Sequence, residues 1–302
     1  MKIYKKTIFS LLLAGLLCFS ALAQSKAPKP SDWISIFNGK DLTGWDIKIA
    51  GYPLNENYQN TFVVEDGMLR VKYDGYKTFD GRYGHIYYNK PFSHYRIRFE
   101  YRFLGDQVPG GDSWNVRNSG IMLHSQPAWS LGKDQTFPVS LEMQLLGGLG
   151  GGERATGNLC SPGTIVDIGG TLADAHCINS TSKTYHGDQW VQAEAIVYGD
   201  SIVYHLIEND TVLTYTNTRV GGGFVSPGHD FKTGKFSAAN AEDWMKLQNT
   251  PLKEGYIALQ SESHAIDFRK IEVLPLKGCM DPKASNFKSY YQVPDKTVCV
   301  YR

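Results

Sequence analysis

The chain has 302 residues, with 31 basic and 30 acidic residues and a formal net charge of +1. This even balance, and the lack of any basic run that could neutralise a phosphate backbone, exclude nucleic acid as an expected partner. The length is ample for one large hydrophobic core, so we expect one main domain.

Residues 1–23 have the features of a secretory signal. Three lysines precede an apolar run at residues 8–17, and residues 21–23 supply a small-residue cleavage site. The run is shorter than the roughly 20 residues that cross a bilayer, so we expect no membrane span. A lipoprotein anchored at Cys18 is disfavoured because the preceding residue is not small. The sequence therefore predicts a periplasmic or secreted protein, cleaved after the signal and continued by a linker at 24–32.

Alternating apolar and polar residues predict β-strands along most of the remaining chain. The clearest pattern covers residues 95–103, where aromatic or aliphatic residues alternate with Arg and Glu. Residues 191–198 and 201–207 flank a Gly-Asp turn and predict a hairpin. Further strands are expected at 211–216, 255–260 and 266–274. Short strands with frequent turns are typical of a β-sandwich.

Helix is expected in one segment only, residues 238–248, which ends before a proline. The glycine-rich stretch 147–152 and the shorter one at 221–223 have few side chains with which to pack, and both predict loops. After residue 276 the sequence becomes compact and polar. We therefore predict a β-sandwich domain at 33–276 and a C-terminal appendix at 277–302.

Four cysteines remain after removal of the signal. An even number in an exported protein favours disulfides, and proximity pairs Cys160 with Cys177 and Cys279 with Cys299, although three connectivities are possible. The spacings contain no Cys-x-x-Cys pair, which disfavours a zinc site. The second disulfide would staple the appendix, which has little core of its own.

Two strand-like stretches place polar side chains on one face. Glu142 and Gln144 alternate with apolar residues, and so do Gln260, Glu262 and His264. If these faces join, two carboxylates, two amides and one or two histidines converge. Such a cluster could hold a divalent cation, or it could supply the acid and base of a glycosidase. A solvated strand face is the ordinary alternative.

Other candidates lie near these strands. Arg117 and Asn118 precede an apolar strand that ends at His124, Arg154 follows the glycine-rich loop, and Trp190 lies where a sugar ring could stack. A turn with a surface histidine, a solvated arginine and a core aromatic residue are the alternatives. Motifs of dinucleotide-binding proteins, serine hydrolases and zincins do not occur, so no nucleotide cofactor is expected.

Several motifs occur in a fixed order along the chain. They are FNGKDLTGW at 37–45, VEDGML at 64–69, NSGI at 118–121, Glu142-x-Gln144, TG at 156–157, GDQW at 187–190, and Gln260 followed by FRKI at 268–271. In these motifs the sequence resembles the 3-keto-disaccharide hydrolase family, from about residue 33 to residue 276.

The resemblance implies a concanavalin A-like jelly roll that acts on glycosides whose C3 hydroxyl has been oxidised to a ketone by a separate sugar 3-dehydrogenase. The ketone acidifies the C2 proton, so a general base can remove it and the glycosidic bond breaks by 1,2-elimination, after which water adds. A cation or arginine near the keto oxygen would stabilise the enolate.

The resemblance assigns Glu142, Gln144 and Glu262 to the site. Glu142, His124 and Glu262 are the candidates for base and acid, and also the candidate ligands of a divalent metal ion. Where family members often carry Arg and Asp, this chain has His124 and Gly147. Two alternatives remain open, namely a glycoside hydrolase acting on unoxidised sugars and a non-catalytic carbohydrate-binding module.

Overall fold

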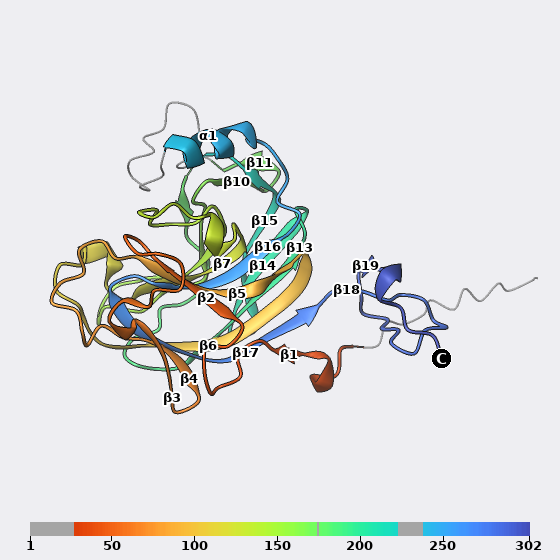
Figure 1. Cartoon of the computed structure of the whole chain (residues 1–302), viewed down its shortest axis with the longest axis horizontal. Coiled ribbons are helices and arrows are strands. Elements are labelled where there is room, and N and C mark those ends of the chain that lie inside the picture. Colours follow the sequence, from red (N-terminus) through yellow and green to blue (C-terminus); the bar gives the residue numbers. More distant parts are fainter. Residues whose placement is uncertain (1–26, 174, 223–237) are drawn as a thin grey trace, which may run out of the picture.

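The computed structural model of the protein describes residues 27–173, 175–222 and 238–302. The predicted signal segment and the last glycine of the 221–223 stretch lie outside the described residues. Two antiparallel sheets, of ten and seven strands, pack around one core (Figure 1). The predicted all-β, concanavalin A-like jelly-roll sandwich is therefore confirmed.

The ten-stranded sheet contains, in spatial order, β11 (Thr171–Leu172), β10 (Thr164–Ile168), β15 (Asp210–Val220), β14 (Ile202–Ile207), β13 (Val191–Tyr198), β6 (His94–Gln107), β17 (His264–Pro275), β4 (Met68–Val71) and β3 (Phe62–Glu65), with β1 (Ile34–Ser35) beside β17. The seven-stranded sheet contains β12 (Cys177–Ile178), β9 (Asn158–Cys160), β8 (Leu141–Leu146), β7 (Asn118–Ser125), β16 (Gly255–Ser261), β5 (Gly84–Phe92) and β2 (Trp45–Ile49). All these strands pair antiparallel with their neighbours, as the jelly-roll prediction requires.

Helical structure in the described residues is scarce. One α-helix, α1 (Ala238–Lys246), lies where a helix is predicted, although it ends two residues earlier than residue 248. The remaining helical turns are the short 3-10 segments η1 (Pro30–Asp32), η2 (Tyr58–Asn60), η3 (Ser113–Asn115), η4 (Ala128–Ser130) and η6 (Lys296–Val298). None of the helices in this part of the chain is long and apolar enough to span a bilayer.

Strand β6 shows how the alternation builds the core. Tyr95, Ile97, Phe99, Tyr101 and Phe103 are each at most 2% exposed and belong to the cluster between the sheets. The Arg and Glu residues between them point to the opposite side and form ion pairs there. Because successive side chains of a strand point to opposite faces, the sequence pattern alone places these charges on the solvent side.

Both predicted disulfides are confirmed. Cys160 and Cys177 face each other in the register of β9 and β12. Cys279 and Cys299 close the polar segment at the C-terminus. The structure joins the pairs that lie near each other in sequence, as expected.

The C-terminal segment packs on one end of the sandwich, from which it projects in Figure 1. Its only regular pairing is between β18 (Lys277–Gly278) and β19 (Val293–Pro294). Tyr290 forms a small separate cluster with Leu274 and Leu276, and Lys288 Nζ lies 2.6 Å from Asp32 Oδ1. The boundary between a domain at 33–276 and an appendix at 277–302 stays a prediction.

Replacing Cys279 and Cys299 together by serine should loosen this segment alone. The bridge closes a loop of sequence separation 20, and such a bridge stabilises by about 3 kcal/mol, while the cluster it supports is small. Hydrogen exchange followed by mass spectrometry should show lost protection in residues 277–302 and unchanged protection in β6. Equal loss in both would mean that the segment is part of the main cooperative unit.

Candidate functional site

Polar side chains gather on the side of the seven-stranded sheet that faces away from the core, which we call the polar face. In β8, Leu141, Met143 and Leu145 are fully buried in the core, so Glu142 and Gln144 point to the polar face. The pairing of neighbouring strands continues this arrangement across the sheet. It aligns Asn158, Gln144, Gly120, Gln260, His85 and Lys48 in one row, which we call the polar row.

Gly120 makes room for the carboxylate of Glu142. A Cβ atom at position 120 would collide with Glu142 Oε1 and would lie 2.9 Å from Glu142 Cδ. The carboxylate therefore lies over the glycine, and the side chain as a whole is 5% exposed. The NSGI motif thus supplies a gap in the polar row into which the acid on the next strand extends.

Glu262 lies in the turn that carries the chain from β16 in one sheet to β17 in the other. The turn is held by Ser263, whose backbone has φ 74° and whose N–H donates to Tyr73 Oη at 2.8 Å. The carboxyl group is 2% exposed. A positive φ at a non-glycine residue is uncommon, so the surroundings must hold this turn in place.

Burial raises the pKa values of both carboxyl groups, and the charge of Glu142 adds to the shift of Glu262. Burial raises the pKa of Glu142 from 4.5 to about 8. Burial raises the pKa of Glu262 well above 4.5, and the nearby charge of Glu142 raises it further, while Arg154 opposes this shift. The charge of Glu142 therefore acts on Glu262, so that one of the two groups can be charged while the other keeps its proton.

Arg154 is the cation that acts on this pair. Its Nη1 donates to the carbonyl oxygens of Val116 and Gly147, each at 2.7 Å. Its charge lowers the pKa of Glu262. The structure thus fixes the predicted arginine beside one of the two predicted acids, which places it where it can face a negatively charged oxygen.

Three buried oxygen atoms near these acids have no hydrogen-bond partner in the part of the chain that the structure describes. They are Asn118 Oδ1, Gln260 Oε1 and Glu262 Oε2. Asn118 Nδ2 donates to Trp114 O at 3.3 Å, which fixes the amide. Buried polar atoms are normally paired, so these oxygens are acceptors available to a hydroxyl-bearing ligand.

The structure separates His264 from the face on which the alternation places it. The turn at Ser263 moves the chain into the other sheet, so His264 packs against Phe103 in the core, with ring centroids 5.7 Å apart. Burial and then the charge of Arg117 lower the pKa of His264 to about 4. The prediction that Gln260, Glu262 and His264 share one strand face is therefore wrong. Period-two alternation holds only within one strand.

Arg117 lies next to His264 and not at the carboxyl pair. Its guanidinium donates to Asp188 Oδ1 at 2.6 Å and to Gly187 O at 2.9 Å. Both contacts are to the loop before β13. Arg117 therefore fixes this loop, and its predicted contact with substrate stays a prediction.

His124 is also apart from the carboxyl pair. Its Nδ1 lies 2.7 Å from Leu252 O and its Nε2 lies 3.2 Å from Ser93 O. Its ring packs on Tyr95 in the core, and burial lowers its pKa to about 4. A neutral imidazole held by main-chain carbonyls cannot exchange a proton with a ligand on the polar face, so we correct its predicted role as acid or base.

Trp190 lies on the opposite side of the sandwich from Glu142. Its ring stacks on the guanidinium groups of Arg102 and Arg269, with distances of 4.6 and 3.8 Å to the ring centroid. These arginines point away from the core on the ten-stranded sheet. The prediction that Trp190 binds the same substrate as Glu142 is wrong, because the GDQW motif precedes β13, a strand of the other sheet.

Sequence reasoning missed three members of the polar row. His85 is 1% exposed and lies 3.5 Å from Gln260, between the two Nε2 atoms. Burial lowers the pKa of His85 to about 3 and that of Lys48 to about 8. Asn158 donates from Nδ2 to Gln144 Oε1 at 3.1 Å. Only strand pairing reveals these residues, since no short motif connects them to Glu142.

The predicted metal ligands do not form a ligand group. Among the described residues, no three His, Cys, Asp or Glu side chains lie together in a way that could hold a metal ion. His124 is turned into the core, which leaves Glu142 and Glu262 alone. A divalent ion in this site stays a prediction, and we derive no step through one.

Two thirds or more of this chain aligns with several solved structures of low identity. A protein from Parabacteroides distasonis ATCC 8503, provisionally named a glycosyl hydrolase, has 15% identity and a TM-score of 0.45, with 83% of this chain and 99% of that chain covered. A Bacillus subtilis carbohydrate-binding module has 10% identity and a TM-score of 0.35, with coverage of 76% and 94%. A Bacillus subtilis protein of galectin-like fold has 12% identity and a TM-score of 0.41, with coverage of 77% and 90%.

No curated protein sequence matches the chain. The family model described as the 3-keto-alpha-glucoside-1,2-lyase-like domain matches residues 32–274, most of the chain. Membership of such a family indicates a carbohydrate-active enzyme, and the matched segment contains Glu142, Gly120, Arg154 and Glu262. The chain therefore belongs to the family of 3-keto-alpha-glucoside-1,2-lyase-like domains.

Proposed function

We propose that this protein is an exported enzyme that cleaves the glycosidic bond of 3-keto-glycosides by C2 deprotonation and 1,2-elimination, followed by addition of water. The observation that carries the proposal is the pair of buried carboxyl groups, Glu142 and Glu262: burial raises both pKa values, and the charge of Glu142 raises that of Glu262 further. Acid and base roles are commonly divided between two such groups when their surroundings separate their pKa values.

Each group has one role in the reaction. The carboxylate of Glu142 removes the C2 proton, and the electron pair forms the C1–C2 double bond as the C1–O bond breaks. Glu262 keeps its proton longer and gives it to the departing oxygen. Water then adds across the double bond, with its hydroxyl on C1 and a proton on C2, so that the net reaction is hydrolysis.

The surrounding side chains orient the sugar. Arg154 faces the negative charge that develops on the C3 oxygen during proton removal. The free acceptors of Asn118 and Gln260 bind sugar hydroxyl groups, and Gln144 extends the same polar row. The keto-sugar must come from a separate reaction that oxidises the C3 hydroxyl, which is the work of a sugar 3-dehydrogenase.

Replacing Glu142 by Gln should lower kcat for release of the aglycone from a 3-keto-glucoside by about 10²–10⁴-fold, the usual contribution of one general base. Glu194→Gln is the matched control, because Glu194 is 6% exposed and is paired with Arg96 on the other sheet. The measurement is aglycone release by purified protein, with an unoxidised glucoside in parallel.

The same assay separates the alternatives. Turnover of the unoxidised glucoside at a comparable rate would indicate an ordinary glycoside hydrolase. Absence of turnover on both substrates, with sugar affinity unchanged in Glu142→Gln, would indicate a carbohydrate-binding module. Full activity of Glu142→Gln on the 3-keto-glucoside would refute the assigned base.

The raised pKa of Glu142 predicts opposite effects of pH on activity and stability. The base must be ionised, so kcat/KM should rise as pH increases through about 8.

The folded state holds a proton on Glu142 between pH 4.5 and about 8 that the unfolded chain has lost. The free energy of unfolding should therefore fall as pH rises through that window, and Glu142→Gln should flatten the fall. Urea unfolding at several pH values tests this. The same dependence of the unfolding free energy on pH in the wild type and in Glu142→Gln would contradict it.

Gly120→Ala should lower kcat about 10- to 100-fold, because the added methyl group would displace the Glu142 carboxylate. Gly151→Ala is the control, since a Cβ at that position meets nothing within 4 Å. In the Glu142→Asp background, Gly120→Ala should lower kcat less than it does in the wild type, because the shorter acid leaves room for the methyl group. Strictly additive losses would show that the two side chains do not interact.

A further inference from the structure

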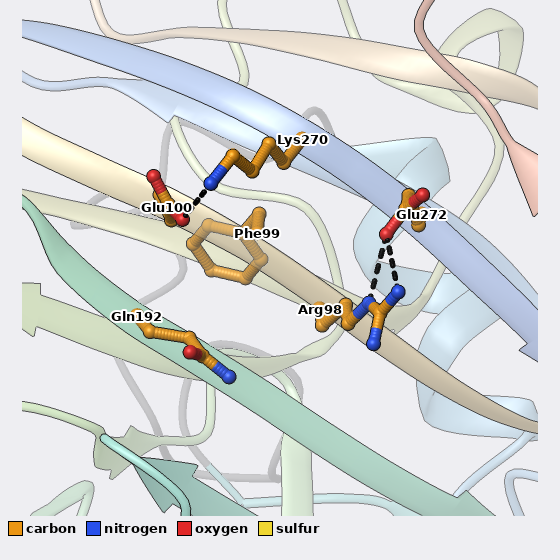
Figure 2. Close-up of a pocket in the computed structure, with 6 residues that line it drawn as sticks. All are labelled: Arg98, Phe99, Glu100, Gln192, Lys270 and Glu272. Atoms are coloured by element: carbon orange, nitrogen blue, oxygen red, sulfur yellow. Dashed lines mark hydrogen bonds and ion pairs between the residues drawn. The ribbon is translucent and has the colours of Figure 1, made fainter. Parts of the chain in front are cut away.

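A hollow lies on the outer face of the ten-stranded sheet, on the side opposite the carboxyl pair. We call it the outer groove. It has a volume of about 240 Å³ and is lined by Arg98, Phe99, Glu100, Gln192, Lys270 and Glu272. Figure 2 shows that these residues come from three adjacent strands and that their polar ends border a common space.

A β-bulge forms one wall of the outer groove. The register between β17 and β6 shifts between Arg269 and Glu272, and Lys270 has φ 53°. As a result the consecutive residues Arg269 and Lys270 both reach Glu100, each at 2.6 Å. Bulges redirect side chains, and a strained non-glycine residue beside a hollow is typical of a binding site.

The floor of the groove is polar but carries no excess charge. Arg98 is paired with Glu272 at 2.8 Å, and Lys270 with Glu100. In Figure 2 both pairs are joined, whereas Gln192 is not linked to either pair. An anionic ligand would find no unpaired cation among the groove residues. Fixed donors and acceptors of both kinds suit a neutral ligand with many hydroxyl groups.

Two tryptophans stack on arginines in or next to the groove lining. Trp33 stacks on Arg98 with 4.0 Å to the ring centroid, and Trp190 stacks on Arg269 at 3.8 Å. The stacked guanidinium groups hold both rings in place, and both side chains are half-buried. Arg98 and Arg102, which mark the two ends on β6, are four residues apart, or about 13 Å. This spacing suits a short oligosaccharide better than a single ring.

We infer that the outer groove is a non-catalytic binding site for a neutral oligosaccharide, with tryptophan rings stacking on the terminal sugars and the paired charges bonding to the sugar between them. The site is independent of the proposed catalytic reaction. It would hold the protein on a glycan through the face opposite the proposed catalytic residues.

Affinity electrophoresis of the full chain tests this inference, with soluble starch, laminarin or hydroxyethyl cellulose as the neutral glucan in the gel and polygalacturonate as the acidic one. Trp190→Ala should weaken retardation by at least one neutral glucan about tenfold. Gln192→Ala, a milder change on the groove floor, should weaken it less. Trp129→Ala is the matched control, because Trp129 is 70% exposed and lies in η4 beside the other sheet.

Glu142→Gln separates this site from the catalytic one, and its retardation should equal that of the wild type. The inference would be overturned by the absence of retardation in all three neutral glucans, by unchanged retardation in both Trp190→Ala and Gln192→Ala, or by stronger retardation in polygalacturonate. The proposed enzymatic function is tested by turnover alone, so either proposal can fail without the other.

Discussion

The apolar interface between the two sheets decides the direction of every functional side chain. Phe99 of one sheet and Met143 of the other both point into the core between the sheets. Their neighbours Glu100 and Glu142 must therefore point to opposite sides of the molecule. One packing constraint therefore creates two separate polar surfaces. The proposed chemistry belongs to one of them, and the charged groove with its tryptophans belongs to the other.

The carboxyl pair depends on this frame in a second way. The seven-stranded sheet keeps Glu142 and Glu262 out of water, and removing the charged form from water raises both pKa values. Gly120 allows the Glu142 carboxylate to lie against the neighbouring strand, because any larger residue at position 120 would occupy the space of the carboxylate. The positive charge of Arg154 offsets part of the free-energy cost of ionising the buried Glu262. Burial thus produces the proposed base, and burial together with the charge of Glu142 produces the proposed acid, without a histidine.

The two surfaces treat charge differently. On the outer face of the ten-stranded sheet, acids such as Glu100 and Glu272 are matched by arginine and lysine, so their charges are compensated. On the polar face, Glu142 has no cation beside it, and its proton becomes available at moderate pH. Compensated charges are suited to holding a neutral ligand, while an uncompensated carboxyl group is suited to moving a proton.

The sequence by itself determined the strand pattern and the family, favoured the two disulfides by proximity, and singled out Glu142 and Glu262 as candidates, because alternation, cysteine spacing and short motifs are local properties. Tertiary structure decided the rest. The turn at Ser263 sends His264 into the core, and the pairing of strands far apart in sequence brings Lys48 into the polar row. Trp190 lies at the ten-stranded sheet because it directly precedes β13, a strand of that sheet. Which strands become neighbours depends on packing of the whole chain, and that information is not contained in any single segment.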